Sequence, residues 1–105
     1  MVTFRWWNDI WLSEAFATYF TFVGANSTVP EFVPFERTGM DASQLGLEFD
    51  GGLGAVPIRP SDDTVLYIPP SQIVYQKGSS LIRMMQCFLT EDTLQAGLRT
   101  YLKEK

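Results

Sequence analysis

The 105-residue sequence has no histidine and a single cysteine, Cys87. The absence of histidine excludes Ser-His and Cys-His catalysis within this chain, and one cysteine allows no internal disulfide. Lys and Arg number eight against twelve Asp and Glu, which gives a formal net charge of −4, and no basic run occurs. This balance argues against a nucleic-acid partner. No apolar run is long enough to span a bilayer, so we expect no membrane segment in this chain.

The chain is rich in apolar material instead. Hydrophobic residues make up 46% of it and aromatic residues 14%, which is not typical of a disordered segment. Its length is enough for one small domain. Helical spacing, rather than strand alternation, dominates both ends of the chain. We therefore expect a mainly α fold of about three or four helices with one long irregular loop.

Two helices are predicted in the first half of the chain. The first covers residues 9–23, with Asn8 as its N-cap and Gly24 as its stop. A short second helix is predicted within 31–44, with Met40 among its apolar anchors.

The second half begins with an irregular region. Residues 45–70 contain so many Gly and Pro residues that no periodic helix is expected there, although Val65–Ile68 is a candidate extended run. A loop of this length usually carries or covers a functional site. Helical spacing then predicts a helix over 71–89 and, after Thr90 as N-cap, an amphipathic helix over 91–105 that lies on an outer face.

Glu14 stands in a run that is otherwise aromatic and aliphatic. Apolar residues surround the first helix almost completely, so the helix is expected to be buried. A buried carboxylate is costly unless something neutralises it. Glu14 is therefore protonated, paired with a cation from elsewhere in the chain, or bound to a metal. Asp9 in the first turn suits the positive end of the helix dipole.

The segment Trp6–Ala17 reads W-W-N-D-I-W-L-S-E-A-F-A. It resembles the helix of M1-family zinc aminopeptidases, of the membrane alanyl aminopeptidase type, that carries the third zinc ligand. The family usually reads L-N-E-G-F-A at its centre, so this chain departs at Ser13 and Ala15, while Glu14 matches the ligand. The resemblance implies a zinc-ligand role for Glu14. It also implies that the chain is the helical C-terminal portion of a thermolysin-like (gluzincin) catalytic domain.

A second segment, Ile73–Met85, resembles the Y-x-K-G-A/S-x-x-x-R-M stretch of the same family. In the family this tyrosine donates a hydrogen bond to the oxyanion of the tetrahedral intermediate, and Tyr75 holds that position here. A phenol with an ordinary pKa near ~10 stays protonated at neutral pH and can donate. Lys77 and Arg83 are expected to be solvated or structurally paired, and the sequence does not assign them a partner such as Asp62 or Asp63.

The resemblance also implies what the chain lacks. Family members bind zinc through an H-E-x-x-H helix together with the downstream Glu, and they capture the substrate amine with G-x-M-E-N; both segments are upstream in the family. One carboxylate, Glu14, cannot hold a catalytic zinc, which needs three protein ligands and an open position. We therefore interpret residues 1–105 as a partial M1 catalytic domain. The intact enzyme would use zinc to remove N-terminal residues from peptides, and this chain alone would be inactive.

Other interpretations stay open at this stage. Glu14 is alternatively a core carboxylate, and Tyr75 a core tyrosine whose hydroxyl reaches the rim. The whole chain is alternatively a non-catalytic docking fragment that pairs with a full-length relative through its exposed apolar faces, or the product of a degenerate copy. Exposed apolar faces also predict self-association. The sequence does not indicate a compartment, because the family has cytosolic and membrane-anchored members.

Overall fold

The computed structural model describes residues 3–31, 35–61 and 68–104, which form helices and no strand. A 3-10 turn leads into the first α-helix, and a π-helical segment runs directly into the third. The predicted mainly α fold is thereby confirmed. The elements follow in the order η1 (Trp7–Asp9), α1 (Ile10–Thr28), α2 (Phe35–Asp50), η2 (Gln72–Lys77), α3 (Gly78–Leu89) and α4 (Glu91–Glu104).

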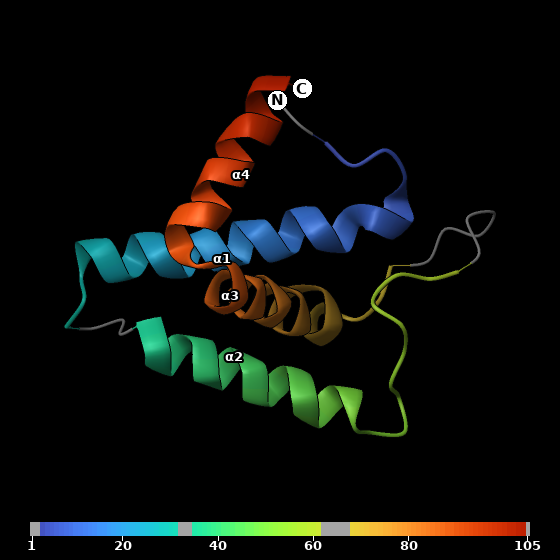
Figure 1. The fold of residues 1–105 in the computed structure, drawn as a ribbon. Coiled ribbons are helices and arrows are strands. Elements are labelled where there is room, and N and C mark those ends of the chain that lie inside the picture. Colours follow the sequence, from blue (N-terminus) through green and yellow to red (C-terminus); the bar gives the residue numbers. More distant parts are fainter. Residues whose placement is uncertain (1–2, 32–34, 62–67, 105) are drawn as a thin grey trace.

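The continuous η2–α3 helix lies between α1 and α2 (Figure 1). Glycines allow this close approach on both sides. A Cβ atom built on Gly78 would lie only 2.8 Å from the Cβ of Ala15 in α1. A Cβ atom built on Gly46 of α2 would lie 2.9 Å from the backbone nitrogen of Lys77. Larger side chains at either glycine would push the helices apart, so these two positions set the helix spacing.

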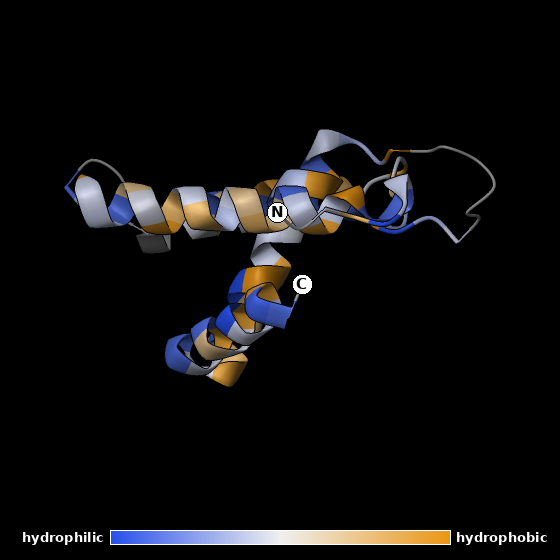
Figure 2. Cartoon of the chain, turned by 90° about the horizontal axis from the view of Figure 1, so that it is seen from above, coloured by the Kyte–Doolittle hydropathy of each residue, from blue (hydrophilic) through white to orange (hydrophobic). Residues whose placement is uncertain are grey.

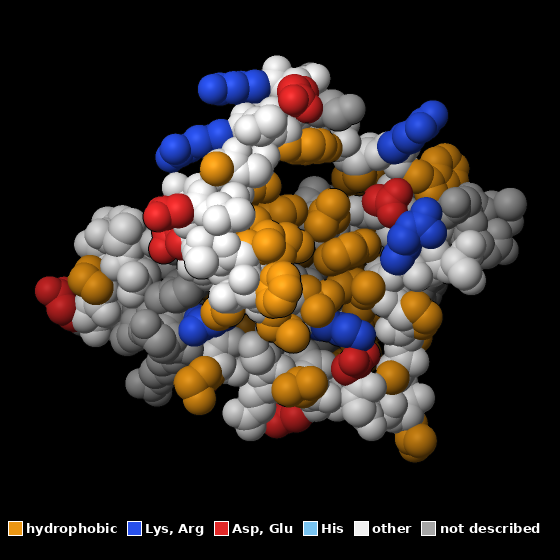
Figure 3. All heavy atoms as spheres, in the orientation of Figure 1, with side chains coloured by type: hydrophobic (Ala, Val, Ile, Leu, Met, Phe, Trp, Pro, Cys, Tyr) orange, Lys and Arg blue, Asp and Glu red, His pale blue; other side chains and the backbone are white. Residues whose placement is uncertain are grey.

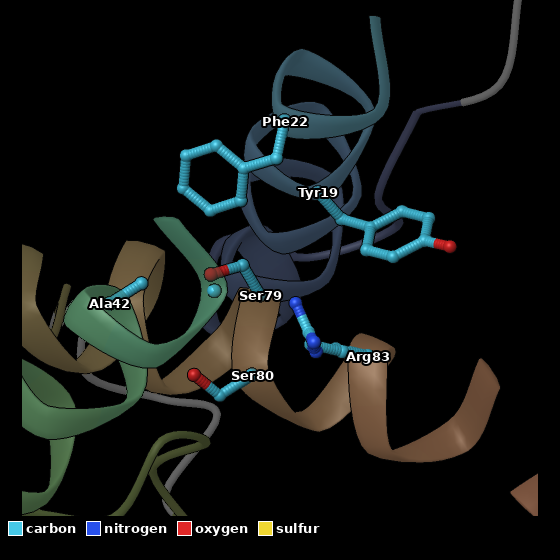
Figure 4. Close-up of a pocket in the computed structure, with 7 residues that line it drawn as sticks. Tyr19, Phe22, Ala42, Ser79, Ser80 and Arg83 are labelled. Atoms are coloured by element: carbon cyan, nitrogen blue, oxygen red, sulfur yellow. The ribbon is translucent and has the colours of Figure 1, made fainter. Parts of the chain in front are cut away.

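The core between α1 and α3 contains Ala15, Tyr19 and Ile82, which are all nearly inaccessible to solvent. The three helices meet around a cavity of about 10 Å³, which has room for one water molecule at most. Figure 4 shows Phe22 and Tyr19 leaving α1 in opposite directions around this junction. The cavity is lined by Tyr19, Phe22, Gly39, Ala42, Ser79, Ser80 and Arg83.

Among the described elements, helix α4 packs chiefly on α3. In the view from above, α1 and α2 overlap and the C-terminal part of the chain projects to one side of them (Figure 2). The apolar stripe of α4 is only partly covered: Leu94 is buried, whereas Tyr101 and Leu102 are exposed. The amphipathic outer helix expected after Thr90 is present, but much of its apolar face has no cover in the described chain.

Helix α1 differs from its predicted bounds at both ends. The predicted cap, Asn8, is fully buried inside the 3-10 turn that the Asp9 N–H closes on the Trp6 carbonyl at 3.0 Å. At the other end the helix continues past Gly24 to Thr28. Gly24 was predicted to stop the helix, but no described glycine adopts the left-handed conformation that such a stop requires.

Helix α2 is longer than predicted and continues to Asp50, so the irregular region begins at Gly51 and not at Leu45. Gly46 lies inside the helix without breaking it. Because it has no side chain, α2 can pack closely against η2 at this position. Met40, predicted as an anchor, is exposed. Most of the candidate extended run at 65–68 lies outside the described residues.

The expectation that α1 is buried all round is wrong for this chain. Only Ala15 and Tyr19 of α1 are buried, whereas Leu12 and Phe20 are more than two-fifths exposed. Hydrophobic side chains gather at the centre of the face shown in Figure 3, over α1 and α3 and below α4. The three other helices are too few to cover α1 on every side. No described helix has the length and apolarity needed to cross a membrane.

Candidate active-site half

The candidate site is formed where η2 crosses the first half of α1. Glu14 is half-buried in the second turn of α1 and directly precedes Ala15, which contacts Gly78. Tyr75 lies in η2, just before Gly78 in the chain, and is 39% exposed. The close Ala15–Gly78 contact therefore brings Glu14 and Tyr75, which are far apart in the sequence, to the same place.

The two side chains interact. The pKa of the Tyr75 phenol is raised above 10.0 by burial, by the negative charge of Glu14 and by a hydrogen bond with the Glu14 carboxylate. A raised pKa keeps the phenol neutral at physiological pH, so its hydroxyl stays a hydrogen-bond donor. The structure thus unites the two residues that the sequence singled out. Among the described residues, the partner that it gives Glu14 is a hydroxyl and not a cation.

The residues that the structure describes do not complete a metal site. The sequence has no histidine, and among the described residues no three His, Cys, Asp or Glu side chains come close enough together to hold an ion. A catalytic zinc needs three protein ligands. Glu14 therefore fits a zinc centre only as one ligand of several, with the others supplied from outside these residues.

An ion pair that the sequence did not reveal anchors η2. The Lys77 Nζ donates to both carboxylate oxygens of Asp50, at 2.7 and 2.8 Å. Asp50 is the last residue of α2, and nothing in the local helical spacing connects it to Lys77. The candidate partners Asp62 and Asp63 lie outside the described residues.

A second ion pair lies at the start of α1. Asp9, predicted to act only on the helix dipole, accepts a hydrogen bond from the Arg59 Nε at 2.6 Å. Asp9 is the N-cap residue of α1 but makes no side-chain capping bond. The irregular region after α2 is thereby connected to the helix that carries Glu14.

The two positions at which α1 departs from the usual M1-like pattern have local explanations. The Ser13 hydroxyl donates to the Ile10 carbonyl at 2.9 Å on the exposed side of the helix. Ala15 is fully buried, and Gly78 leaves room for its methyl group. Neither departure disturbs the meeting of Glu14 and Tyr75.

Comparison with known protein families identifies the family to which the chain belongs. The model of the peptidase family M1 domain matches residues 1–105, the whole chain. This chain belongs to peptidase family M1. Aminopeptidase Ey of Gallus gallus is 34% identical over 111 residues, which include 99% of this chain. Aminopeptidase N of Mus musculus is 34% identical over 109 residues and 97% of this chain.

The M1 relatives extend to plants and are much longer than this chain. Aminopeptidase M1 of Arabidopsis thaliana is 34% identical over 105 residues, which include 98% of the chain. The matched regions are 11% of the Gallus gallus and Mus musculus proteins and 12% of the Arabidopsis thaliana protein. No solved structure matches the chain. The M1 assignment therefore rests on sequence over the full length of the chain.

Proposed function

We propose that residues 1–105 form part of the catalytic domain of a zinc-dependent M1 aminopeptidase, which removes N-terminal residues from peptides. The observation that carries this proposal is the close contact of α1 with η2 and α3 at Ala15 and Gly78, which brings Glu14 near Tyr75, so that its carboxylate contributes to the raised pKa of the phenol. Both residues occupy motif positions, and the M1 assignment covers the whole chain. The relatives named above are aminopeptidases, which supports the same reaction.

In the proposed site the two residues have different tasks. Glu14 offers one carboxylate to a metal whose other ligands come from outside this chain. Tyr75 donates a hydrogen bond to the oxygen on which negative charge develops when a peptide bond is attacked. Such a donor lowers the barrier because it is already oriented before the charge appears. The neutral form of the phenol, which the setting of Tyr75 favours, is the form that this task needs.

Two measurements on purified protein test the proposal. The isolated chain is expected to carry no stoichiometric zinc and to release no product from an aminoacyl chromogenic substrate. When the chain replaces the matching segment of the Gallus gallus aminopeptidase Ey, the chimera is expected to bind zinc and to hydrolyse the substrate. A folded chimera that binds zinc and shows no hydrolysis would contradict the proposal, and so would hydrolysis by the isolated chain.

A second candidate function is a docking fragment without catalysis. The solvent-accessible surface of the chain is 7402 Å², whereas a compact monomer of its mass exposes about 5,900 Å². Large apolar side chains lie on this surface, and Phe88 on α3 and Leu102 on α4 are largely exposed. A stable, monomeric chain whose chimera is inactive would favour this candidate.

A further inference from the structure

The π-helical segment that carries Tyr75 needs support from its neighbours. π-Helical turns are rare, occur mostly as single turns inside α-helices, and are frequent at functional sites. In η2 the inward side is fixed by Ile73 and Val74, which are almost completely buried. Tyr75 itself is 39% exposed. The direction of the Tyr75 side chain therefore depends on how the π-helical turn is held at Lys77, the C-terminal residue of η2.

Lys77 is held by α2 through both its backbone and its side chain. Its backbone passes so close to Gly46 that a Cβ there would lie 2.9 Å from the Lys77 nitrogen. One turn further along α2, Asp50 accepts two hydrogen bonds from the Lys77 ammonium group, at 2.7 and 2.8 Å. The side chains of the pair are about one-third exposed or less, at 27% for Lys77 and 33% for Asp50.

Asp50 is poorly placed for the stability of its own helix. It is the last residue of α2, where the negative end of the helix dipole disfavours a carboxylate. The ammonium group of Lys77 compensates the charge of the Asp50 carboxylate, to which it donates two hydrogen bonds. The contribution of Asp50 is therefore to the contact with η2 and not to α2 alone.

We propose that Asp50 is a positioning residue: its ion pair with Lys77 holds the π-helical turn of η2 so that the Tyr75 hydroxyl meets Glu14. This inference rests on the proposed function, because it concerns the alignment of the two site residues. The contacts that carry it, between Asp50 and Lys77, lie outside the proposed site itself. Asp50 thus acts on Tyr75 through Lys77 and needs no contact with a substrate.

The test is made on the 105-residue chain with isotopically labelled tyrosine ring carbons and isoleucine methyl groups. The NMR shifts of the ring carbons respond to hydrogen bonding at the hydroxyl. Loss of the Tyr75 signal in the Tyr75→Phe variant identifies it among the four tyrosines. The Glu14→Leu variant gives the shift of a phenol that has lost its partner. Asp50→Asn is expected to move the Tyr75 signal most of the way to that value. Asp50→Glu, which keeps the charge, is expected to retain the wild-type shift.

Glu48→Gln is the matched control, because it changes the same chemical group on the same helix. The Glu48 side chain accepts a hydrogen bond from Gln44 within α2, and its replacement is expected to leave Tyr75 unchanged. The inference is overturned if Asp50→Asn leaves the Tyr75 shift unchanged. It is also overturned if Asp50→Glu behaves like Asp50→Asn, or if the buried methyl signals of Ile73 and Ile82 move as much as Tyr75. An unaltered shift in Glu14→Leu would instead refute the contact on which the proposed function rests.

Discussion

The spacing of α1 and α3 depends on the contact between Gly78 and Ala15. A side chain added at Gly78 is therefore expected to destabilise the fold. In Gly78→Ala, the new Cβ would lie 2.8 Å from the Cβ of Ala15. Carbon atoms in contact are usually about 3.5–4.0 Å apart, so the two helices must separate by roughly 1 Å. Both atoms are fixed directly to helical backbone, and no side-chain rotation relieves the clash.

The expected magnitude follows from two opposing effects. Overpacking a core typically destabilises it by about 1–3 kcal/mol, and the rigidity of this contact favours the upper end. Replacing a helical glycine by alanine stabilises by about 1 kcal/mol. We therefore expect Gly78→Ala to lower the free energy of unfolding by about 2 kcal/mol. A Cβ atom added at Gly24 would have nothing within 4 Å, so Gly24→Ala is expected to raise that free energy by about 0.5–1 kcal/mol.

A further variant at the same contact, Ala15→Gly, removes the Cβ atom with which the methyl group of Gly78→Ala clashes. Alone it is expected to destabilise by about 2 kcal/mol, since it deletes a buried methyl and introduces a helical glycine. Combined with Gly78→Ala it exchanges the two residue types across the contact. The double variant is expected to lie within about 1 kcal/mol of wild type, with a coupling energy of at least about 3 kcal/mol.

The free energies of unfolding of the four variants are measured by urea-induced unfolding, followed by tryptophan fluorescence and by far-ultraviolet circular dichroism. Strictly additive effects of Ala15→Gly and Gly78→Ala would refute the close contact. A Gly78→Ala chain that is stabilised as much as Gly24→Ala would refute it too, because the helix-propensity effect would then act without opposition.

Three further predictions concern the rest of the chain. The pKa values of Tyr75 and Tyr19 are both raised above 10.0, chiefly by burial, so the folded state holds these protons more tightly than the unfolded state. The two tyrosines contribute their full stabilisation below about pH 10, and this stabilisation is lost as the pH rises through their pKa values in the folded state. Midpoints of urea-induced unfolding that do not fall at high pH would contradict this prediction. Gly46→Ala, which would crowd the Lys77 backbone, is expected to destabilise by up to about 2 kcal/mol despite its better helix propensity; calorimetry showing a raised melting temperature would refute it. The isolated chain is expected to self-associate through its exposed apolar face, and Phe88→Lys is expected to weaken that association; sedimentation velocity of a purely monomeric wild type would exclude it.

The sequence predicted the fold class and the family but not the extent of α1 and α2. Gly24 and Gly46 were both interpreted as helix breakers, because glycine is often found where helices end. In the structure Gly24 simply continues α1, and Gly46 provides the gap into which η2 packs. The role of a glycine depends on what lies opposite it in space, which local spacing does not contain.

The two candidate site residues were singled out in the sequence because each lies in a long and specific motif. That Glu14 and Tyr75 lie near one another was implied only by the family resemblance, and the interaction that raises the pKa of Tyr75 was not predicted. The ion pair of Asp50 with Lys77 was missed, because the two residues lie on different helices with the long loop between them. The burial of α1 was overestimated, since an apolar helix is buried only if enough chain is present to cover it.

The separate tasks proposed for Glu14 and Tyr75 can be measured most directly in the chimera with the Gallus gallus aminopeptidase Ey. Zinc content and turnover of an aminoacyl chromogenic substrate are measured for Glu14→Gln and for Tyr75→Phe. Glu14→Gln is expected to lose the zinc, whereas Tyr75→Phe is expected to retain it and to lose about 10²–10³-fold in kcat. Zinc that survives in Glu14→Gln, or full turnover in Tyr75→Phe, would contradict the account.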